Sequence, residues 1–173
     1  LAQQRRQQQP ENRGDDLLSI LVGFVEASDL TVEEFRDNMV TFLFAGHETT
    51  ALGLTYTLLC LAQHPDEQAN LRAEVDAVRD GAVTAADLPK LERMEHVISE
   101  ALRLYPPVYM FFREATQDVT LRGYDIPAGT TLVLPQWAVH RDPEWWDDPE
   151  TFHPERFSDD GDHPEYAYFP FGG

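Results

Sequence analysis

An acid and a hydroxyl stand side by side in an apolar stretch of this sequence, at Glu48 and Thr49. Such a pair can pass protons into a dry pocket. Gly46 costs a helix interior about 1 kcal/mol relative to alanine, which indicates the close approach of another group or a local opening of the helix. The alternative is a helix–helix contact at Gly46 beside a hydrogen-bonded core glutamate. A zinc-protease motif is excluded, because H-E-x-x-H requires histidine where Ala51 stands.

A second pair, Glu100 and Arg103, has the i, i+3 spacing at which a helix brings opposite charges together. Glu33 and Arg36 share that spacing, and there we predict a solvated pair that contributes roughly a few tenths of a kcal/mol. The setting of Glu100 and Arg103 differs, because they lie in an otherwise apolar helix just before the Leu-Tyr-Pro-Pro of residues 104–107. We therefore expect this pair to be buried, where it needs further hydrogen-bond partners.

Arg156 is the only base between residues 142 and 165, a segment with ten acids that carries half of the net charge of −18. It belongs to the motif Phe-His-Pro-Glu-Arg-Phe at 152–157. One interpretation is a surface arginine among carboxylates. The other is an arginine that anchors this irregular segment to a buried acid such as Glu100.

Hydrophobic periodicity predicts the elements that position these residues. The segment 15–25 has an amphipathic helical pattern, and Thr31 with Glu34 forms a capping box at the start of a long apolar helix. That helix runs to about Gln63, which gives a length of roughly 48 Å at 1.5 Å per residue. It is not a membrane span, because His47 and Glu48 interrupt its apolar run. Two more helices follow, one at 66–78 and one from Thr84 to the prolines at 106–107. Short strands are predicted at 119–126 and at 131–134.

The composition excludes several classes of protein. The chain has 173 residues and one cysteine, which excludes an internal disulfide and any multi-cysteine zinc or iron–sulfur site. The net charge of −18 argues against nucleic acid and anionic lipid as partners. Twelve of the 13 bases are arginine and one, Lys90, is lysine. This acidic, lysine-poor balance favours a halophilic source, with an ordinary acidic cytosolic protein as the alternative.

Four motifs occur in order: Ala-Gly-His-Glu-Thr-Thr at 45–50, Glu-x-x-Arg at 100–103, Pro-Glu-Arg-Phe at 154–157 and Phe-Pro-Phe-Gly-Gly at 169–173. In this order and spacing they resemble the cytochrome P450 family of haem-thiolate monooxygenases, over essentially the whole chain from about Asp15. The resemblance implies a mainly α fold with a small β-sheet. It also implies that residues 1–173 are part of a single P450 domain, without its N-terminal portion and its cysteine-ligand loop.

The resemblance implies roles for the residues of the long helix. Ala45 and Gly46 would border the groove that binds oxygen, where a side chain at Gly46 would crowd dioxygen. Glu48 and Thr49 would be the acid–alcohol pair that helps to deliver protons for O–O cleavage. The apolar residues that would line the substrate pocket are Phe44, Ala45, Val108 and Met110.

Further roles follow for the second half of the chain. By resemblance, Glu100, Arg103 and Arg156 would form the charge cluster that locks the helix to the following meander, which is a structural role. Arg113 follows the Glu-x-x-Arg helix at the spacing at which many members place an arginine that binds a haem propionate. The alternative is a surface arginine beside Glu114. Phe171, at the start of the haem-ligand loop, would contact the cofactor.

One departure from the family pattern concerns the iron ligand. The thiolate of the family lies in a loop that begins Phe-Gly-x-Gly-x-Arg-x-Cys, and this sequence stops at Gly173. Cys60 cannot replace it, because Cys60 lies late in the long helix without a basic or glycine-rich setting that favours a thiolate. We interpret Cys60 as a small core residue. We therefore expect a fragment that is inactive by itself, with the axial cysteine beyond Gly173.

For the intact protein, the resemblance implies haem b and the insertion of one oxygen atom from O2 into a lipophilic organic substrate. Electrons would come from a separate partner, a ferredoxin or a flavoprotein reductase. The sequence has no apolar signal core and no membrane span, so we expect a cytoplasmic protein. Two alternatives stay open: a family member with non-monooxygenase chemistry, and a non-enzymatic acidic helical binding module.

Overall fold

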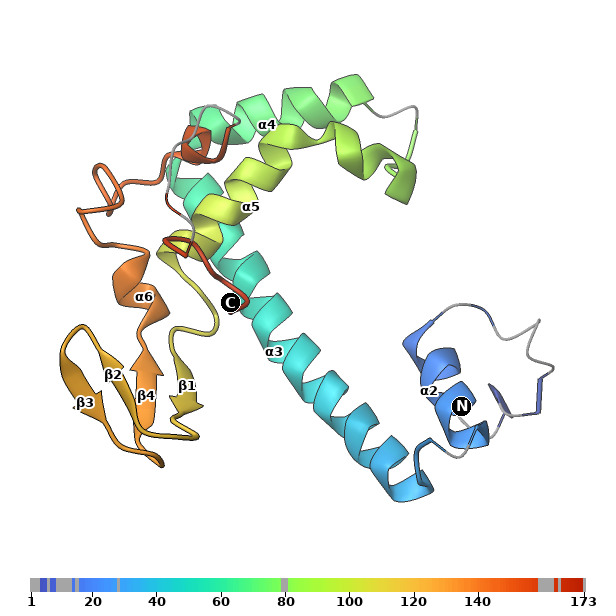
Figure 1. The fold of residues 1–173 in the computed structure, drawn as a ribbon. Coiled ribbons are helices and arrows are strands. Elements are labelled where there is room, and N and C mark those ends of the chain that lie inside the picture. Colours follow the sequence, from blue (N-terminus) through green and yellow to red (C-terminus); the bar gives the residue numbers. More distant parts are fainter. Residues whose placement is uncertain are drawn as a thin grey trace. The chain divides into compact units, whose positions relative to one another are not determined.

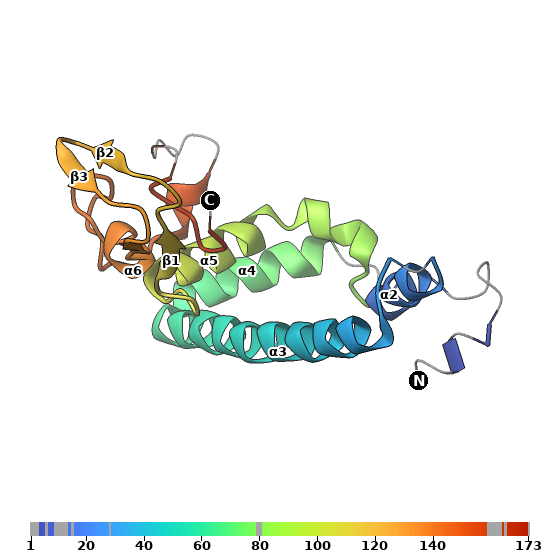
Figure 2. The same ribbon diagram turned by 60° about the horizontal axis from the view of Figure 1, so that its bottom comes forward.

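The computed structural model describes residues 4–5, 7–8, 14, 16–27, 29–78, 81–158, 164 and 166–172. Backbone contacts divide the chain into two compact units, residues 1–48 and 49–173, and each is described by itself. Figures 1 and 2 show the ribbon from two directions. The boundary falls inside the long helix α3 (Val32–Gln63), so the two halves of α3 belong to different units.

The first unit contains α2 (Leu17–Glu26) and the start of α3. Asp16 caps α2, because its carboxylate accepts the backbone N–H of Ser19 at 2.8 Å and the Ser19 hydroxyl at 2.7 Å. These hydrogen bonds hold the pKa of Asp16 below its usual value. Leu21 and Val22 are the buried apolar residues of α2. The amphipathic helix predicted for 15–25 is confirmed.

Helix α3 begins and ends as the sequence predicts. The Thr31 N–H donates to the Glu34 carboxylate at 2.8 Å, and the Glu34 N–H donates to the Thr31 hydroxyl at 3.2 Å, which completes the capping box. The helix ends at Gln63, directly before His64 and Pro65.

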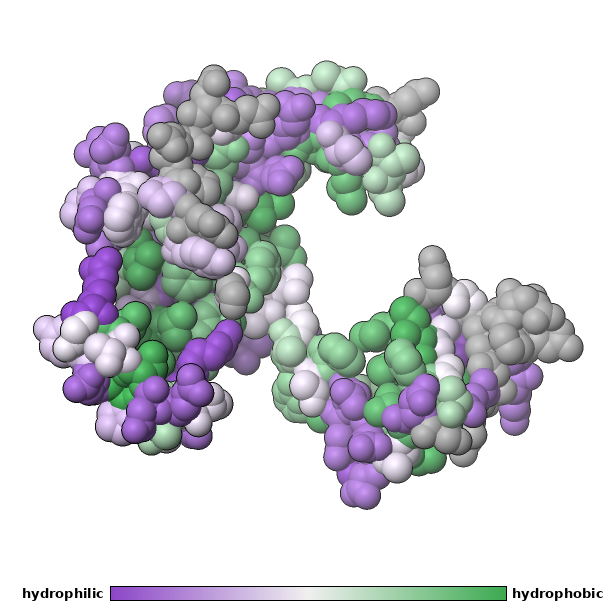
Figure 3. Space-filling model, in the orientation of Figure 1, coloured by the Kyte–Doolittle hydropathy of each residue, from purple (hydrophilic) through white to green (hydrophobic). Residues whose placement is uncertain are grey.

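Much of the apolar surface of α3 is exposed in this chain. Figure 3 shows green, apolar atoms along the middle of the helix. The buried residues of α3 lie near its C-terminal end and are Thr57, Cys60 and Leu61. The large exposed apolar side chains on α3 are Val32, Val40, Phe42, Leu43, Phe44, Leu54, Leu58 and Leu59. No helix within the described ranges has both the length and the apolar character needed to cross a membrane.

In the second unit, α4 (Pro65–Val78) lies beside α5 (Glu92–Leu104) in both ribbon views (Figures 1 and 2). An ion pair joins the two helices, since Nη2 of Arg93 lies 2.7 Å from the Glu67 carboxylate. The carboxylate of Glu74 in α4 accepts the backbone N–H groups of Arg93 at 2.7 Å and Met94 at 3.1 Å, and so caps the start of α5. The core of this unit draws on α3, α4, α5 and the meander, through Cys60, Leu61, Leu71, Val97, Ala101, Leu104 and Phe152.

The helix predicted from Thr84 onward is interrupted. Residues Ala85–Lys90 form a short 3₁₀ helix, η2, and the α-helix α5 starts only at Glu92. Pro89 explains the break, because proline has no backbone N–H and its ring clashes with the preceding turn of an α-helix. The prediction of one continuous helix is therefore wrong, whereas its end before the prolines at 106–107 is confirmed.

Four short strands form two antiparallel sheets among the described residues. β1 (Phe111–Glu114) pairs with β4 (Thr131–Leu134), and β2 (Val119–Leu121) pairs with β3 (Tyr124–Ile126). The turn at 122–123 has positive φ at both residues, 48° and 86°, as a type I′ hairpin turn requires. β1 has no counterpart among the predicted strands, because Phe-Phe-Arg-Glu lacks polar–apolar alternation and forms a strand against β4. The mainly α fold with a small β-sheet is confirmed.

After β4, the chain forms the short helix α6 (Gln136–Val139) and one turn of 3₁₀ helix, η3 (Pro154–Phe157). The chain between α6 and η3, residues 140–153, is irregular, as predicted. This segment is called the meander. The division into two units does not decide whether residues 1–173 are part of one domain, so that expectation stays a prediction.

Candidate functional site

Glu100 and Arg103 on α5 are both fully buried, with 0% of either side chain exposed. Nε and Nη2 of Arg103 bind the two Glu100 oxygens at 2.7 and 2.9 Å, so the pair is bidentate. The guanidinium also lies over the ring of Trp146, 5.1 Å from its centroid. The burial expected for this pair is confirmed.

The other Arg103 donors reach the meander. Nη1 donates to the carbonyl oxygens of His140 and Pro149, both at 2.7 Å, and Nη2 donates to that of Thr151 at 3.3 Å. All five N–H donors of the guanidinium are thus occupied, which offsets the cost of burying its charge. Through one side chain, α5 fixes the backbone of the meander at three places.

Glu100 binds the meander as well. Its Oε1 accepts the backbone N–H of His153 at 2.9 Å and lies 3.4 Å from Nε of Arg156. Arg156 donates in addition to the Asp148 carbonyl oxygen at 2.9 Å. The structure therefore brings Glu100, Arg103 and Arg156 together, and the interpretation of Arg156 as an anchor is the better one.

His140 is a buried residue of this cluster that the sequence motifs do not single out. Its ring Nε2 accepts the backbone N–H of Phe169 at 3.0 Å. Burial lowers the pKa of His140 to about 4, and the charges of Arg103 and Arg141 act in the same direction, so the ring is neutral near pH 7. Within the described ranges, His140 Nδ1 has no hydrogen-bond partner. The one signal in the sequence is a histidine that follows three apolar or aromatic residues at 137–139.

We expect protonation of His140 to destabilise the protein as the pH falls from about 6.5 to 4. The unfolded chain binds this proton with an ordinary histidine pKa near 6.5, and the folded chain binds it only near 4. Between these values the free energy of unfolding should fall by up to about 1.4 kcal/mol per pH unit. Denaturant unfolding at several pH values in this window measures the slope. His140→Gln should flatten it and His153→Gln, at an exposed site, should not; equal slopes for all three proteins contradict the prediction.

The acid–alcohol pair lies in uninterrupted helix, since residues 44–50 are helical throughout. A Cβ added to Gly46 would meet no atom of the described residues within 4 Å, apart from the nearby helix backbone. Within the described residues of the first unit, no helix packs against Gly46. Thr49 is half-buried and shares a helix face with Gly46 and Ala45, three and four residues earlier. Glu48 is exposed and no described segment covers its side chain, so it is not the core glutamate of the alternative interpretation.

Comparison with known proteins settles the family. A sequence model described as cytochrome P450 matches residues 1–173. The chain belongs to the cytochrome P450 family. Cytochrome P450 4d2 of Drosophila melanogaster is 40% identical over 163 residues, which cover 90% of this chain and 32% of the relative. Cytochrome P450 4V2 of Rattus norvegicus is 41% identical over 152 residues, which cover 84% of this chain and 29% of the relative.

A solved P450 structure matches as well. The retinoic acid-bound cyanobacterial CYP120A1 has a TM-score of 0.90 and 36% sequence identity, over 99% of this chain and 40% of that one. The chain spans about a third of the length of the curated P450 relatives it matches.

The remaining predicted P450 site residues of the second unit lie in or near β1 and at the C-terminal turn. Arg113 is exposed on β1, and its Nη1 donates to the Phe112 carbonyl oxygen at 3.1 Å. Val108 is exposed and Met110 is half-buried, just before β1, and Phe171 is 86% exposed. Phe44, Ala45 and Gly46 belong to the first unit. The cofactor and substrate roles of all these residues stay predictions.

Cys60 is a core residue of α3, 2% exposed. Burial raises the pKa of the thiol to about 11, and the charge of Glu100 adds to the shift. A thiol with this pKa stays protonated near pH 7, whereas a haem ligand must be a thiolate. The interpretation of Cys60 as a small core residue is confirmed by its burial.

We expect Cys60 to resist alkylation in the folded P450 at about pH 8 and to react at once in denaturant. The thiolate is the nucleophile, and burial both suppresses it and blocks access to the reagent. Peptide mapping by mass spectrometry after brief iodoacetamide treatment resolves Cys60 from any other cysteine of the full-length protein. Alkylation of folded Cys60 at the rate of a free cysteine would contradict its assignment to the core.

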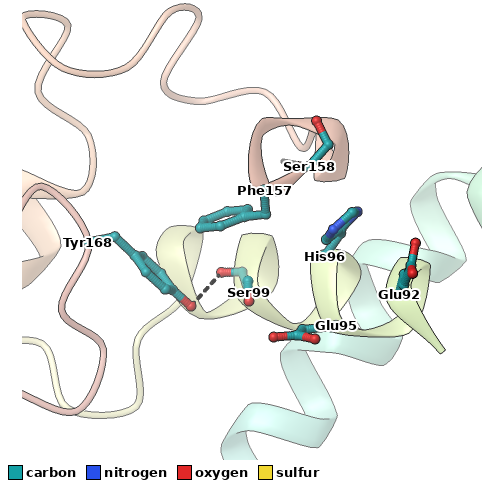
Figure 4. A pocket seen from close by; sticks show the side chains of 7 residues that line it. All are labelled: Glu92, Glu95, His96, Ser99, Phe157, Ser158 and Tyr168. Carbon is teal, nitrogen blue, oxygen red and sulfur yellow. Dashed lines mark hydrogen bonds between the residues drawn. The ribbon is translucent and has the colours of Figure 1, made fainter. Parts of the chain in front are cut away.

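A pocket of about 600 Å³ lies beside α5 in the second unit, and Figure 4 shows its lining side chains, Glu92, Glu95, His96, Ser99, Phe157, Ser158 and Tyr168. It contains none of the predicted site residues. The Tyr168 hydroxyl donates to the Ser99 carbonyl oxygen at 3.1 Å (Figure 4), and burial raises the pKa of Tyr168 to about 12. Within the described ranges, no group of three or more His, Cys, Asp or Glu side chains is arranged to hold a metal ion.

Proposed function

We propose that the protein containing this chain is a haem-dependent monooxygenase that inserts one oxygen atom from O2 into a lipophilic organic substrate. The observation that carries the proposal is the helix face shared by Ala45, Gly46 and Thr49, with no described atom within 4 Å of a Cβ at Gly46 and with Glu48 directly before Thr49 in the sequence. An alcohol beside an acid serves proton delivery during O–O cleavage, which a P450 that rearranges or reduces its substrate does not require. The acidic binding module is set aside, because the family match covers the whole chain.

The described residues fit a haem in part. In the first unit, a Cβ at Gly46 would meet no described atom within 4 Å; in the second, the exposed guanidinium of Arg113 can bind a carboxylate such as a propionate. The aromatic ring of Phe171 is exposed and can contact a planar cofactor. Cys60 does not fit as the iron ligand, so the axial thiolate of the proposed enzyme lies outside the described residues. When bound, a haem with a thiolate ligand supplies the chemistry that cleaves the O–O bond.

The chain's own residues have separate tasks in this proposal. The Thr49 hydroxyl holds and passes a proton at its Oγ1, and Glu48 connects that hydroxyl to solvent, which its exposed side chain permits. Phe44, Val108 and Met110 provide apolar surface for the substrate. The cyanobacterial relative was solved with retinoic acid bound, and that lipophilic molecule supports a lipophilic substrate class here. Electrons come from a separate ferredoxin or flavoprotein reductase; the cytoplasmic location and the halophilic source stay predictions.

Two measurements on the full-length protein test this function. The reduced protein with carbon monoxide should give the spectrum of a thiolate-ligated haem, and the 173-residue chain alone should not. With 18O2 and a compound that gives a substrate-binding difference spectrum, the product should carry one 18O atom. A full-length protein without the thiolate spectrum, or a product without labelled oxygen, refutes the proposal.

A further inference from the structure

His140 joins two parts of the second unit that are otherwise far apart in the sequence. Its carbonyl oxygen accepts from Arg103, so its backbone belongs to the buried charge cluster. Its ring accepts the backbone N–H of Phe169 at 3.0 Å. The ring is 0% exposed and packs against the rings of Tyr168 and Phe169, with both pairs of centroids 5.3 Å apart.

The segment that His140 holds is a tight turn, residues 169–172. The Gly172 N–H donates to the Phe169 carbonyl oxygen at 3.1 Å and closes the turn. Gly172 has a φ of 89°, a conformation that favours glycine. A Cβ at Gly172 would lie 3.6 Å from the ring of Phe111, so this end of the turn passes close to β1. The orientation of the turn therefore depends on what holds Phe169.

We propose that His140 is a positioning residue, whose neutral ring ties the turn at 169–172 to the Glu100–Arg103 cluster. This inference rests on the proposed function, in which the loop with the haem thiolate follows this turn. An error in the direction of the turn would be carried into that loop. His140 thus acts on the haem ligand through the backbone of Phe169 and is not a catalytic residue.

The chemistry of this position explains why a neutral imidazole is suited to it. A donor N–H from Phe169 requires an acceptor, so Nε2 carries no proton and the proton of the neutral ring is on Nδ1. A carboxylate at this place would add a second buried acid near Glu100. Phenylalanine would keep the ring and its packing but would leave the Phe169 N–H buried without its acceptor, which is costly.

The experiment compares His140→Phe and His140→Gln in the full-length haem protein. Phenylalanine removes the acceptor, whereas the glutamine carboxamide reaches about as far as Nε2 and restores one. Two quantities are read: the hydrogen-exchange rate of the Phe169 amide, and the fraction of haem with the thiolate carbon-monoxide spectrum. His153→Phe, at an exposed histidine of the same segment, is the matched control.

With His140→Phe, we expect the Phe169 amide to exchange at least about fivefold faster, because one hydrogen bond is lost. We also expect the fraction of haem with the thiolate spectrum to fall. His140→Gln should recover most of both, and His153→Phe should change neither. Unchanged exchange and an unchanged thiolate fraction in His140→Phe overturn the proposal, as does a failure of glutamine to recover either.

If His140→Phe does not fold, ¹⁵N NMR of the wild-type protein decides. The proposal requires the His140 proton on Nδ1, and a proton on Nε2 overturns it. The two proposals also fail separately. A wild-type protein without a thiolate spectrum refutes the monooxygenase, while exchange at Phe169 and the tautomer still report on His140.

Discussion

Arg103→Ala is expected to destabilise the full-length P450 by about 3–5 kcal/mol, a large part of the roughly 5–15 kcal/mol typical of a folded protein, and so to lower its haem content. The substitution leaves the Glu100 carboxylate buried at 0% exposure with its main countercharge removed. It also leaves three meander carbonyl oxygens, of His140, Pro149 and Thr151, without the donor that binds them. Arg156 lies 3.4 Å from Glu100 and can compensate for a small part of this loss.

The measurement is denaturant unfolding together with haem content per purified protein. Arg36→Ala is the matched control, because Glu33 and Arg36 repeat the same spacing on an exposed helix face, 3.5 Å apart. That pair is solvated, so its loss should change the free energy of unfolding by less than about 0.5 kcal/mol. Arg103→Lys should behave more like alanine than like the wild type, since lysine cannot form the bidentate contact. Similar unfolding energies for Arg103→Ala and Arg36→Ala would contradict the importance given to this cluster.

Thr49→Ala is expected to separate oxygen consumption from product formation in the full-length P450. Without the hydroxyl beside Glu48, protons reach dioxygen less directly, and reduced oxygen species leave before the substrate reacts. Positioned proton transfer contributes about 10²- to 10⁴-fold to rates, so a loss of at least about tenfold in product per O2 consumed is reasonable. The protein should still fold and bind substrate, because alanine is well tolerated in a helix.

The ratio of product formed to O2 consumed, at saturating substrate and reductant, measures this effect. Thr55→Ala is the control, because Thr55 lies on the same helix and donates its hydroxyl to the Ala51 carbonyl oxygen at 2.7 Å. It should leave the ratio unchanged. A Thr49→Ala enzyme with wild-type coupling would remove Thr49 from the proton path, whatever its activity.

The helix ends could be predicted from the sequence because their signals are local. The Thr31–Glu34 capping box is contained within four residues, and the structure has it. The same reasoning placed the helix end before the prolines at 106–107. The break at Pro89 differs from the continuous helix that the hydrophobic pattern predicts.

The burial of residues was predicted less evenly. Glu100 and Arg103 were expected inside because their helix is otherwise apolar, and they are fully buried. Glu48 also lies in an apolar stretch of a helix, but it is exposed. The difference is that α5 packs against α4, η3 and the meander, whereas no described segment covers the middle of α3 at Glu48. An apolar neighbourhood in the sequence indicates burial only where another element supplies the covering atoms.

By itself, the sequence determined the bounds of α3, the pairing of Glu100 with Arg103 and the family, because capping signals, spacing along a helix and motif order are properties of the chain. Only the tertiary structure decided the partners of Arg103 in the meander, the contact between His140 and Phe169, and the pairing of β1 with β4. These contacts involve backbone carbonyl groups, which every residue has, and backbone N–H groups, which every residue except proline has. Such groups carry no side-chain signal, so the fold alone determines which of them meet.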